Sequence, residues 1–240
     1  MSKNHYIANG QIKLGKKEVC TLIHRKNEKK MLHNRAAQFG ISLTEDHIES
    51  LCLFIDLLVE WNSKINLTGT SDRSRIINEL LLDSLVPVPY LPEKGKLVDL
   101  GSGAGFPALI IKILKPGLEV KLLESNGKKV SFLKYAIHSL HLKGITAINK
   151  RIELVTEETK TWGCNIVTSR AMASLETIIR LSETFLSPGG LIVGFLGKDG
   201  DKELKNIQEI FLKYNMQLQD SITYQLPEKE SERTTVLIKK

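Results

Sequence analysis

The sequence is poor in cysteine, in aromatic side chains and in long hydrophobic runs. Its three cysteines, Cys20, Cys52 and Cys164, stand far apart without a C-x-x-C pair, so they support neither a disulfide framework nor a cysteine zinc site. The longest apolar run, Leu51 to Val59, has nine residues and includes Asp56, whereas a membrane-spanning helix needs about 20. The basic N-terminus is not followed by the apolar stretch of a secretory signal. We therefore expect a reduced, cytoplasmic protein without membrane contact.

The net charge of +7 says little as a total, because all of it comes from one end of the chain. Residues 1–40 hold nine Lys or Arg and two Glu, while residues 41–240 hold 25 basic and 25 acidic residues. Because Met31 could itself be a start, the basic segment before it is either an RNA-binding arm or merely upstream sequence. A second basic cluster, residues 121–151 with seven Lys or Arg and one Glu, belongs to the folded body. This cluster is the better candidate for contact with nucleic acid.

Hydrophobic periodicity divides the chain into three parts. Residues 1–30 show no sustained period, and we predict a basic, poorly ordered extension there. Residues 31–92 contain an amphipathic pattern over 44–62 with Thr44 as N-cap, and a second helical pattern over about 73–85. They predict a small N-terminal helical subdomain. Residues 93–240 form the third part, in which apolar strands alternate with helices.

This alternation predicts an α/β, Rossmann-like fold with a mostly parallel sheet and right-handed crossovers. We predict strands at 96–100, 118–124, 145–149, 165–168 and 191–196, and helices at 109–114, 127–142 and 175–186. The last two apolar segments, 217–226 and 233–239, predict an antiparallel hairpin at the edge of the sheet.

A glycine-rich loop follows the first predicted strand, where open α/β sheets bind ligands. Gly101, Gly103 and Gly105 have the spacing G-x-G-x-G, and Phe106 stands where a dinucleotide-binding loop would have glycine. The bulky ring, followed by proline, occupies the space that a pyrophosphate would need. This favours a nucleoside cofactor that has no pyrophosphate, such as S-adenosylmethionine. Glu124 ends the second strand, and its two oxygens can accept both ribose hydroxyls. The alternative is a structural tight turn and a helix-capping acid.

Five motifs occur in order within about residues 44 to 198. They are Asn-Ser-Lys-Ile-Asn-Leu-Thr at 62–68, Leu-Asp-Ser-Leu at 82–85, Asp-x-Gly-Ser-Gly-Ala-Gly-Phe-Pro at 99–107, Leu-Leu-Glu-Ser-Asn-Gly-Lys-Lys-Val-x-Phe-Leu at 122–133 and Val-Thr-Ser-Arg-Ala at 167–171. Together they resemble the bacterial small-subunit ribosomal RNA guanine-N7 methyltransferases, the RsmG or GidB family. The resemblance implies a class I S-adenosylmethionine-dependent methyltransferase fold and methylation of one guanine in the 16S rRNA of the small ribosomal subunit.

The resemblance also implies cofactor contacts at Gly101 and Phe106, at Ile152-Glu153 after the third strand, and at Arg170 after the fourth. With the residues of the glycine loop, the candidate cofactor-binding set is Gly101, Gly103, Gly105, Phe106, Glu124, Ser125, Ile152, Glu153 and Arg170. The guanidinium of Arg170 can donate hydrogen bonds to guanine O6 or hold the cofactor carboxylate. A surface ion pair at a strand end is the other interpretation of Arg170.

The implied chemistry requires no acid or base, because guanine N7 attacks the sulfonium methyl through a lone pair and has no proton to lose. We therefore expect catalysis by positioning, without a catalytic triad and without a metal. His138 and His141 lie one helical turn apart without a nearby acid or cysteine, and we interpret them as surface histidines. The candidate RNA-binding residues are Lys128, Lys129, Lys134 and Lys198. We expect a monomer.

Two positions depart from the family pattern. Glu79-Leu80-Leu81 stands where members commonly have Lys-His-Phe, and Ala108 replaces a glycine after the Phe-Pro pair. The first change makes a basic, hydrogen-bonding corner acidic and apolar.

Three other functions are alternatives. A methyltransferase for a small molecule would be indifferent to RNA, and a nicotinamide-dependent oxidoreductase is disfavoured by Phe106. A non-catalytic RNA-binding protein would bind no cofactor.

Overall fold

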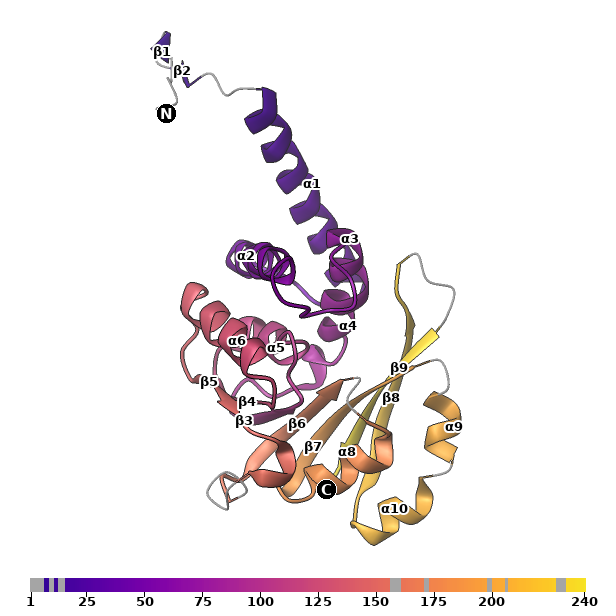
Figure 1. Cartoon of the computed structure of the whole chain (residues 1–240). Coiled ribbons are helices and arrows are strands. Elements are labelled where there is room, and N and C mark those ends of the chain that lie inside the picture. Colours follow the sequence, from indigo (N-terminus) through magenta and orange to yellow (C-terminus); the bar gives the residue numbers. More distant parts are fainter. Residues whose placement is uncertain are drawn as a thin grey trace.

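The computed structural model describes residues 7–8, 11–12, 16–155, 161–170, 173–197, 200–205, 207–227 and 232–240. Within these ranges, the core is a seven-stranded sheet in the order β5-β4-β3-β6-β7-β9-β8 (Figure 1). Its strands are β3 (Gly95–Leu100), β4 (Leu118–Glu124), β5 (Ile145–Asn149), β6 (Cys164–Arg170), β7 (Leu186–Leu196), β8 (Gln217–Gln225) and β9 (Glu232–Lys239). Strands β3 to β7 pair in parallel, and β9 runs antiparallel to β7 and β8. The parallel sheet and the edge hairpin predicted from the sequence are confirmed.

Apolar side chains on successive strand positions point to opposite faces of the sheet and build two cores. In β3, Leu97 belongs to the core that faces α5 (Ala108–Leu114) and α6 (Gly127–Ser139), whereas Val98 belongs to the core that faces α8 (Leu175–Ser182). Two short helices that the sequence did not predict, α9 (Gly200–Lys205) and α10 (Gln208–Lys213), precede the hairpin. Figure 1 shows helices on both sides of the sheet. The sheet is therefore covered as a Rossmann-like fold requires.

Helix α6 ends at Ser139, three residues before the predicted end. His141 has a left-handed φ of +52°, which a continuing α-helix cannot contain. The rings of His138 and His141 lie 6.5 Å apart on exposed side chains. The described residues contain no group of three or more His, Cys, Asp or Glu arranged to hold a metal ion.

The N-terminal helices pack on the same face of the sheet as α5 and α6. They are α1 (Lys16–Gln38), α2 (Glu45–Asn62), α3 (Arg73–Arg75), the π-helix η1 (Ile76–Leu81), α4 (Leu82–Leu85) and the 3-10 helix η2 (Val88–Tyr90). Phe54 of α2 contacts Phe106 and Phe132, with ring centroids 5.3 and 6.3 Å apart. Since these residues belong to one continuous apolar cluster, the N-terminal helices share a core with the sheet.

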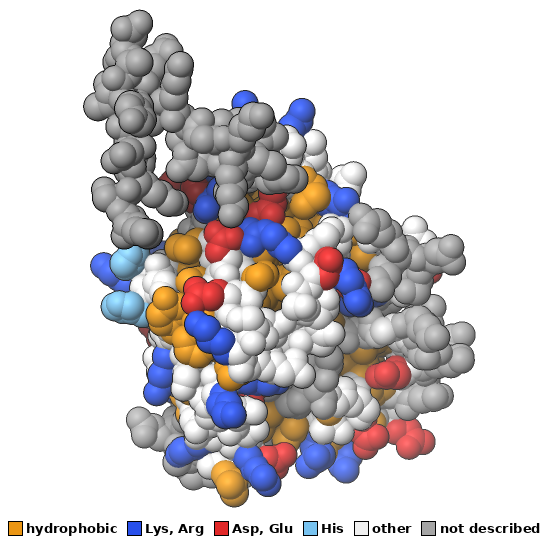
Figure 2. Space-filling model, turned by 45° about the horizontal axis from the view of Figure 1, so that its top comes forward, with side chains coloured by type: hydrophobic (Ala, Val, Ile, Leu, Met, Phe, Trp, Pro, Cys, Tyr) orange, Lys and Arg blue, Asp and Glu red, His pale blue; other side chains and the backbone are white. Residues whose placement is uncertain are grey.

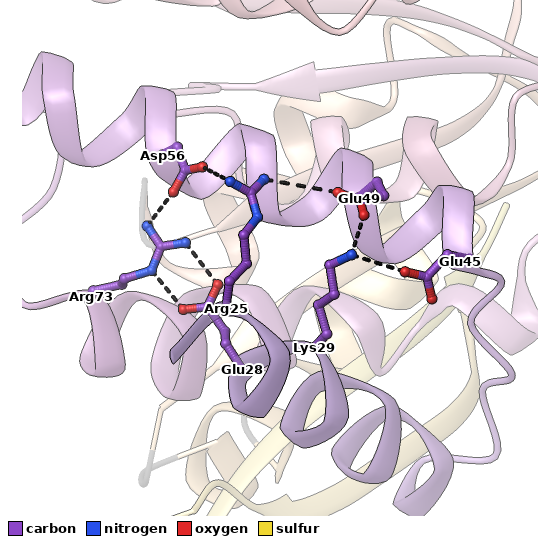
Figure 3. A network of polar contacts seen from close by, with 7 residues as sticks. All are labelled: Arg25, Glu28, Lys29, Glu45, Glu49, Asp56 and Arg73. Carbon is purple, nitrogen blue, oxygen red and sulfur yellow. Dashed lines mark hydrogen bonds and ion pairs between the residues drawn. The ribbon is translucent and has the colours of Figure 1, made fainter. Parts of the chain in front are cut away.

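The structure differs from the sequence prediction over residues 16–30, which lie in α1. A short antiparallel pair, β1 (Ile7–Ala8) and β2 (Gln11–Ile12), precedes it. Residues 25–29 of this helix are attached through charge rather than through an apolar stripe, because Arg25, Glu28 and Lys29 form ion pairs with α2 and α3 (Figure 3). A search for hydrophobic period alone could not find such a helix. None of the helices in the described ranges is long and apolar enough to cross a membrane.

Candidate active site

A cavity of about 980 Å³ lies at the carboxyl ends of the parallel strands. Its lining comes from the loop after β3 with the end of β4, from Lys129 of α6, from the residues after β5, from Arg170 at the end of β6, and from the N-terminal helical region. We call the last of these the N-terminal wall, which consists of 67–70, Arg75, Glu79 and Leu80. Among the described candidate residues for cofactor binding, all but Gly105 line this cavity. The topology thus brings together segments that are far apart in the sequence.

The glycine loop bends so that its backbone faces the cavity. The N–H groups of Gly101 and Ser102 both donate to the carbonyl of Leu123, at 2.9 and 3.0 Å, which fixes the loop to β4. Gly101 and Gly103 have φ values of +70° and +55°, where side chains are disfavoured. At Gly103, the nearest atom to an added Cβ is 3.8 Å away, so the backbone rather than a crowded neighbour requires glycine. The loop presents bare backbone to a ligand.

Gly105 has a different role from the one predicted for it, because it does not line the cavity. With φ at +93°, a Cβ at this position would lie 2.4 Å from Leu109 Cδ1 and 3.3 Å from Leu133 Cδ2. Glycine is therefore required here so that α5 can pack closely behind the loop.

Glu124 is held by backbone groups on both of its oxygens. Gly103 N–H donates to Oε2 at 2.9 Å, and Asn126 N–H donates to Oε1 at 2.7 Å. The residue is 8% exposed and borders the cavity beside the exposed Ser125. Since each carboxylate oxygen accepts more than one hydrogen bond, Glu124 retains acceptor capacity toward a ligand while its orientation is fixed.

Asp99, at the end of β3, is buried close to this site but does not line the cavity. Its Oδ1 accepts a 2.6 Å hydrogen bond from the Thr168 hydroxyl, while its Oδ2 has no partner among the described atoms. Burial raises the pKa of Asp99 to about 7, and the charge of Glu124 adds to this shift. The sequence contained no signal for this behaviour, since it depends on the depth of the strand end.

Arg170 reaches the cavity from the end of β6 and is anchored to the N-terminal helices. Its Nε donates to Asp83 Oδ2 at 2.8 Å, and its Nη2 donates to the carbonyl of Glu79 at 3.1 Å. The Asp83 side chain is 1% exposed and also accepts from Tyr224 and Arg233. Arg170 is thus both a cavity residue and a partner in a buried ion pair. The ion pair is buried, so it is not a surface pair. The bonds to Asp83 and Glu79 use Nε and Nη2, whereas the ligand interpretation concerns the other donors of the guanidinium.

The acidic and apolar corner noted in the sequence forms part of the N-terminal wall. Arg75 Nε donates to Glu79 Oε1 at 3.0 Å, and the side chain of Glu79 is 16% exposed. Leu80 is half-buried beside it. The departure from the family pattern therefore lies in the cavity itself.

The candidate RNA-binding lysines lie at different distances from the cavity. Lys129 lines it, whereas Lys128 and Lys134 are exposed on α6 outside it, and Lys198 lies outside the described residues. The cavity is also lined by Lys150, Arg151 and Leu154, which were not among the site residues predicted from the sequence. Their position directly after β5, beside the Ile152-Glu153 pair, was the signal that could have identified them. Figure 2 shows that basic side chains on the visible face are interspersed with acidic ones.

A comparison with protein families matches residues 47–235 to the family GidB, described as rRNA small subunit methyltransferase G. Curated proteins named ribosomal RNA small subunit methyltransferase G are similar over most of the chain. One from Acetivibrio thermocellus is 32% identical over 214 residues, covering 88% of this chain and 88% of that protein. One from Geobacter sp. is also 32% identical, covering 88% of this chain and 96% of that protein.

Two solved structures share the fold at low sequence identity. M. jannaschii TYW2 in complex with AdoMet superposes with a TM-score of 0.53 at 14% identity, covering 65% of this chain and 73% of that one. The B. subtilis tRNA methyltransferase TrmK superposes with a TM-score of 0.52 at 12% identity, covering 68% and 65%. These similarities support the Rossmann-like α/β fold of class I methyltransferases.

Proposed function

This chain belongs to the rRNA small subunit methyltransferase G family, and on that basis we propose how its cavity carries out methyl transfer from S-adenosylmethionine to guanine N7 of small-subunit rRNA. The protein is an S-adenosylmethionine-dependent methyltransferase. The observation that carries the proposal is one cavity that joins the glycine loop, Glu124 and Arg170 to a wall of N-terminal residues.

The glycine loop and the ends of the neighbouring strands form the cofactor part of the cavity. The backbone of Gly101 and Gly103 lies against the nucleoside, Glu124 accepts the ribose hydroxyls, and Ile152 and Glu153 border the adenine. Phe106 is 7% exposed and packs on Phe54, so its ring closes the floor rather than leaving room for a pyrophosphate. The residues present therefore fit S-adenosylmethionine. When bound, this cofactor supplies an electrophilic methyl group on a positively charged sulfur.

The N-terminal wall and Arg170 form the substrate part of the cavity. Arg170 directs its remaining donors toward guanine O6, next to the attacking N7, while Asp83 and the Glu79 carbonyl hold its orientation. N7 has a lone pair and no proton to lose, so the chain supplies no general base. Its contribution is to hold the base in attack geometry, an effect that supplies about 7–11 kcal/mol in well-oriented reactions.

The RNA approaches over α6 and the mouth of the cavity. The helix carries three lysines and no acid, and Lys129 borders the cavity while Lys128 and Lys134 are exposed along the helix. Phosphate contacts at these lysines position the RNA without reading its sequence. The folded unit in this proposal comprises the N-terminal helices, from α1 to residue 92, and the Rossmann-like residues 93–240.

The test is methyl transfer to 16S rRNA or small subunits from cells lacking the gene. With labelled S-adenosylmethionine, we expect label in one guanine, located by N7-specific cleavage and primer extension. An absence of label in rRNA at adequate enzyme concentration would contradict the proposal. Cofactor turnover that is independent of RNA and of salt would instead indicate a small-molecule substrate.

A further inference from the structure

Three carboxylates line the described part of the cavity, and two of them belong to its cofactor part. Glu124 is held under the glycine loop by two backbone N–H groups, and the exposed Glu153 follows β5. Glu79 is the third and stands on the N-terminal wall, 16% exposed, where family members commonly have a lysine. The structure thus places an acceptor-only group in the substrate part of the cavity.

The two edges of a guanine base differ in their hydrogen-bonding groups. N7 and O6 are acceptors, and N7 must face the methyl donor during the reaction. The opposite side carries the N1–H and the N2 amino group, which are donors. A carboxylate matches these two donors, whereas adenine presents an unprotonated N1 there and has no amino group at C2. A carboxylate on this side therefore favours guanine over adenine.

Arg75, Glu79 and Arg170 all line the cavity and are joined by hydrogen bonds. Arg170 Nη2 donates to the backbone carbonyl of Glu79, so Arg170 and Glu79 are neighbours in the lining. In guanine, O6 and N1–H are likewise adjacent. Arg75 Nε, one helical turn away along the chain, donates to Glu79 Oε1 at 3.0 Å and orients the carboxylate.

We propose that Glu79 is a specificity-determining residue that accepts hydrogen bonds from the N1–H and N2 amino group of the target guanine. This inference rests on the proposed function and adds a means of base selection to it. Leu80, half-buried beside Glu79, borders the same space with an apolar side chain.

The experiment compares small subunits reconstituted with guanosine or with inosine at the nucleotide found by primer extension. Inosine lacks only the N2 amino group, and methyl incorporation from labelled S-adenosylmethionine measures kcat/KM for both. For the wild type, we expect inosine to lower kcat/KM roughly 10- to 100-fold, as for a missing hydrogen bond to a charged group. For Glu79→Gln, we expect lower activity on guanosine and an inosine penalty within about threefold.

Glu153→Gln is the matched control, because it removes a carboxylate from the cofactor part of the same cavity. It should keep the wild-type ratio between guanosine and inosine, whatever its effect on cofactor affinity. Melting temperature and S-adenosylmethionine binding of Glu79→Gln should match the wild type, which separates base reading from folding.

Equal kcat/KM for inosine and guanosine in the wild type would overturn the inference, as would an unchanged penalty in Glu79→Gln. If the wild type still methylates guanosine at N7 when one of these two results is found, the proposed function is unaffected. If the wild type fails to methylate N7 in the subunits that contain guanosine, both the proposed function and the role of Glu79 are overturned.

Discussion

Two buried carboxylates stand at the ends of neighbouring strands and have opposite surroundings. Glu124 accepts a backbone N–H on each oxygen, whereas Oδ2 of Asp99 has no partner in the described part of the chain. The pairing of Glu124 fixes its orientation at the cavity. The burial of Asp99 disfavours its charged form and links its protonation to stability.

Replacing Glu124 by Gln should weaken S-adenosylmethionine binding about 10- to 100-fold, because one acceptor for a ribose hydroxyl is removed and the N–H groups of Gly103 and Asn126 lose a charged partner. Isothermal titration calorimetry measures the affinity. Glu119→Gln, at an exposed position of the same strand, should leave it unchanged. Equal affinity in both variants and the wild type would contradict the role of Glu124.

The stability of the protein should fall between about pH 4 and pH 7 through Asp99. In the unfolded chain this carboxyl ionises near its ordinary pKa of 3.8, while in the folded protein its pKa is raised to about 7. Between these values the folded state binds more protons, so stability decreases as pH rises, by at most about 1.4 kcal/mol per pH unit.

In Asp99→Asn, this decrease should be absent, so the stability of the variant relative to wild type should grow from pH 4 to pH 7 and stay constant above it. Urea unfolding over this range measures the difference. A pH-independent difference would show that Asp99 has an ordinary pKa in the folded protein.

At the scale of elements, α1 illustrates a helix whose position depends on charge. Seven side chains from α1, α2 and α3 form one network, in which Glu28 accepts from Arg73 at 2.6 and 2.7 Å and Arg73 also pairs with Asp56 at 2.7 Å (Figure 3). The side chain of Glu28 is 16% exposed. Unlike an exposed pair, this contact is partly shielded from solvent.

Arg73→Gln should loosen α1, because it leaves Glu28 half-buried without its cationic partner. We expect a decrease of about 1–3 kcal/mol in the free energy of unfolding and faster amide exchange in residues 25–38. Glu60→Gln, which breaks the exposed pair with Lys64, should change stability by less than about 0.5 kcal/mol. Unaltered exchange in α1 of Arg73→Gln would show that the apolar contacts alone hold this helix.

We predict that the lysines of helix α6 bind RNA phosphates. Lys128→Ala and Lys134→Ala together should lower affinity for small-subunit rRNA at low salt and reduce the slope of log K against log salt by up to about 2, one for each phosphate that is no longer neutralised. Filter binding at several salt concentrations measures this slope. Lys213→Ala in α10 is the control and should leave it unchanged. An unchanged slope in the double variant would remove α6 from the RNA interface.

At the scale of the whole molecule, Asp83 joins parts that are distant in the sequence. Its carboxylate in α4 accepts from Arg170 in β6, from Tyr224 in β8 and from Arg233 in β9. One buried group thus fixes the N-terminal helices to the parallel sheet and to the edge hairpin. It also fixes Arg170, so the geometry of the cavity depends on how these three parts meet.

Asp83→Asn should lower the free energy of unfolding by about 3–5 kcal/mol, because two guanidinium groups lose their buried anionic partner. Tyr224→Phe removes one neutral donor to the same carboxylate and should lower the free energy of unfolding by about 1 kcal/mol. Chemical denaturation measures both. Similar decreases in the two variants would show that the charge of Asp83 contributes little.

Local sequence patterns were sufficient for most elements of the fold. Period-2 and period-3.6 patterns placed the parallel strands, α2 and the edge hairpin, because burial of one face leaves a regular apolar spacing in the chain. Helices α9 and α10 are too short to show such a period. In α1, residues 25–29 are attached by ion pairs, and only the later part of the helix buries apolar side chains, those of Leu32 and Ala36. The π-helix within residues 76–81 likewise has no signature distinct from an α-helix.

By itself, the sequence determined the family, the glycine loop and the acid at the end of the second strand, because motif spacing along a strand-turn-helix unit fixes local geometry. Only the tertiary structure decided that Gly105 packs against Leu109 while Gly103 faces the cavity, that Arg170 is held by Asp83, and that Glu79 stands on the N-terminal wall. The last two properties depend on contacts between residues up to 91 positions apart, such as the Arg170 bond to Glu79. Such contacts are made by the packing of the N-terminal helices on the sheet, which local periodicity does not encode.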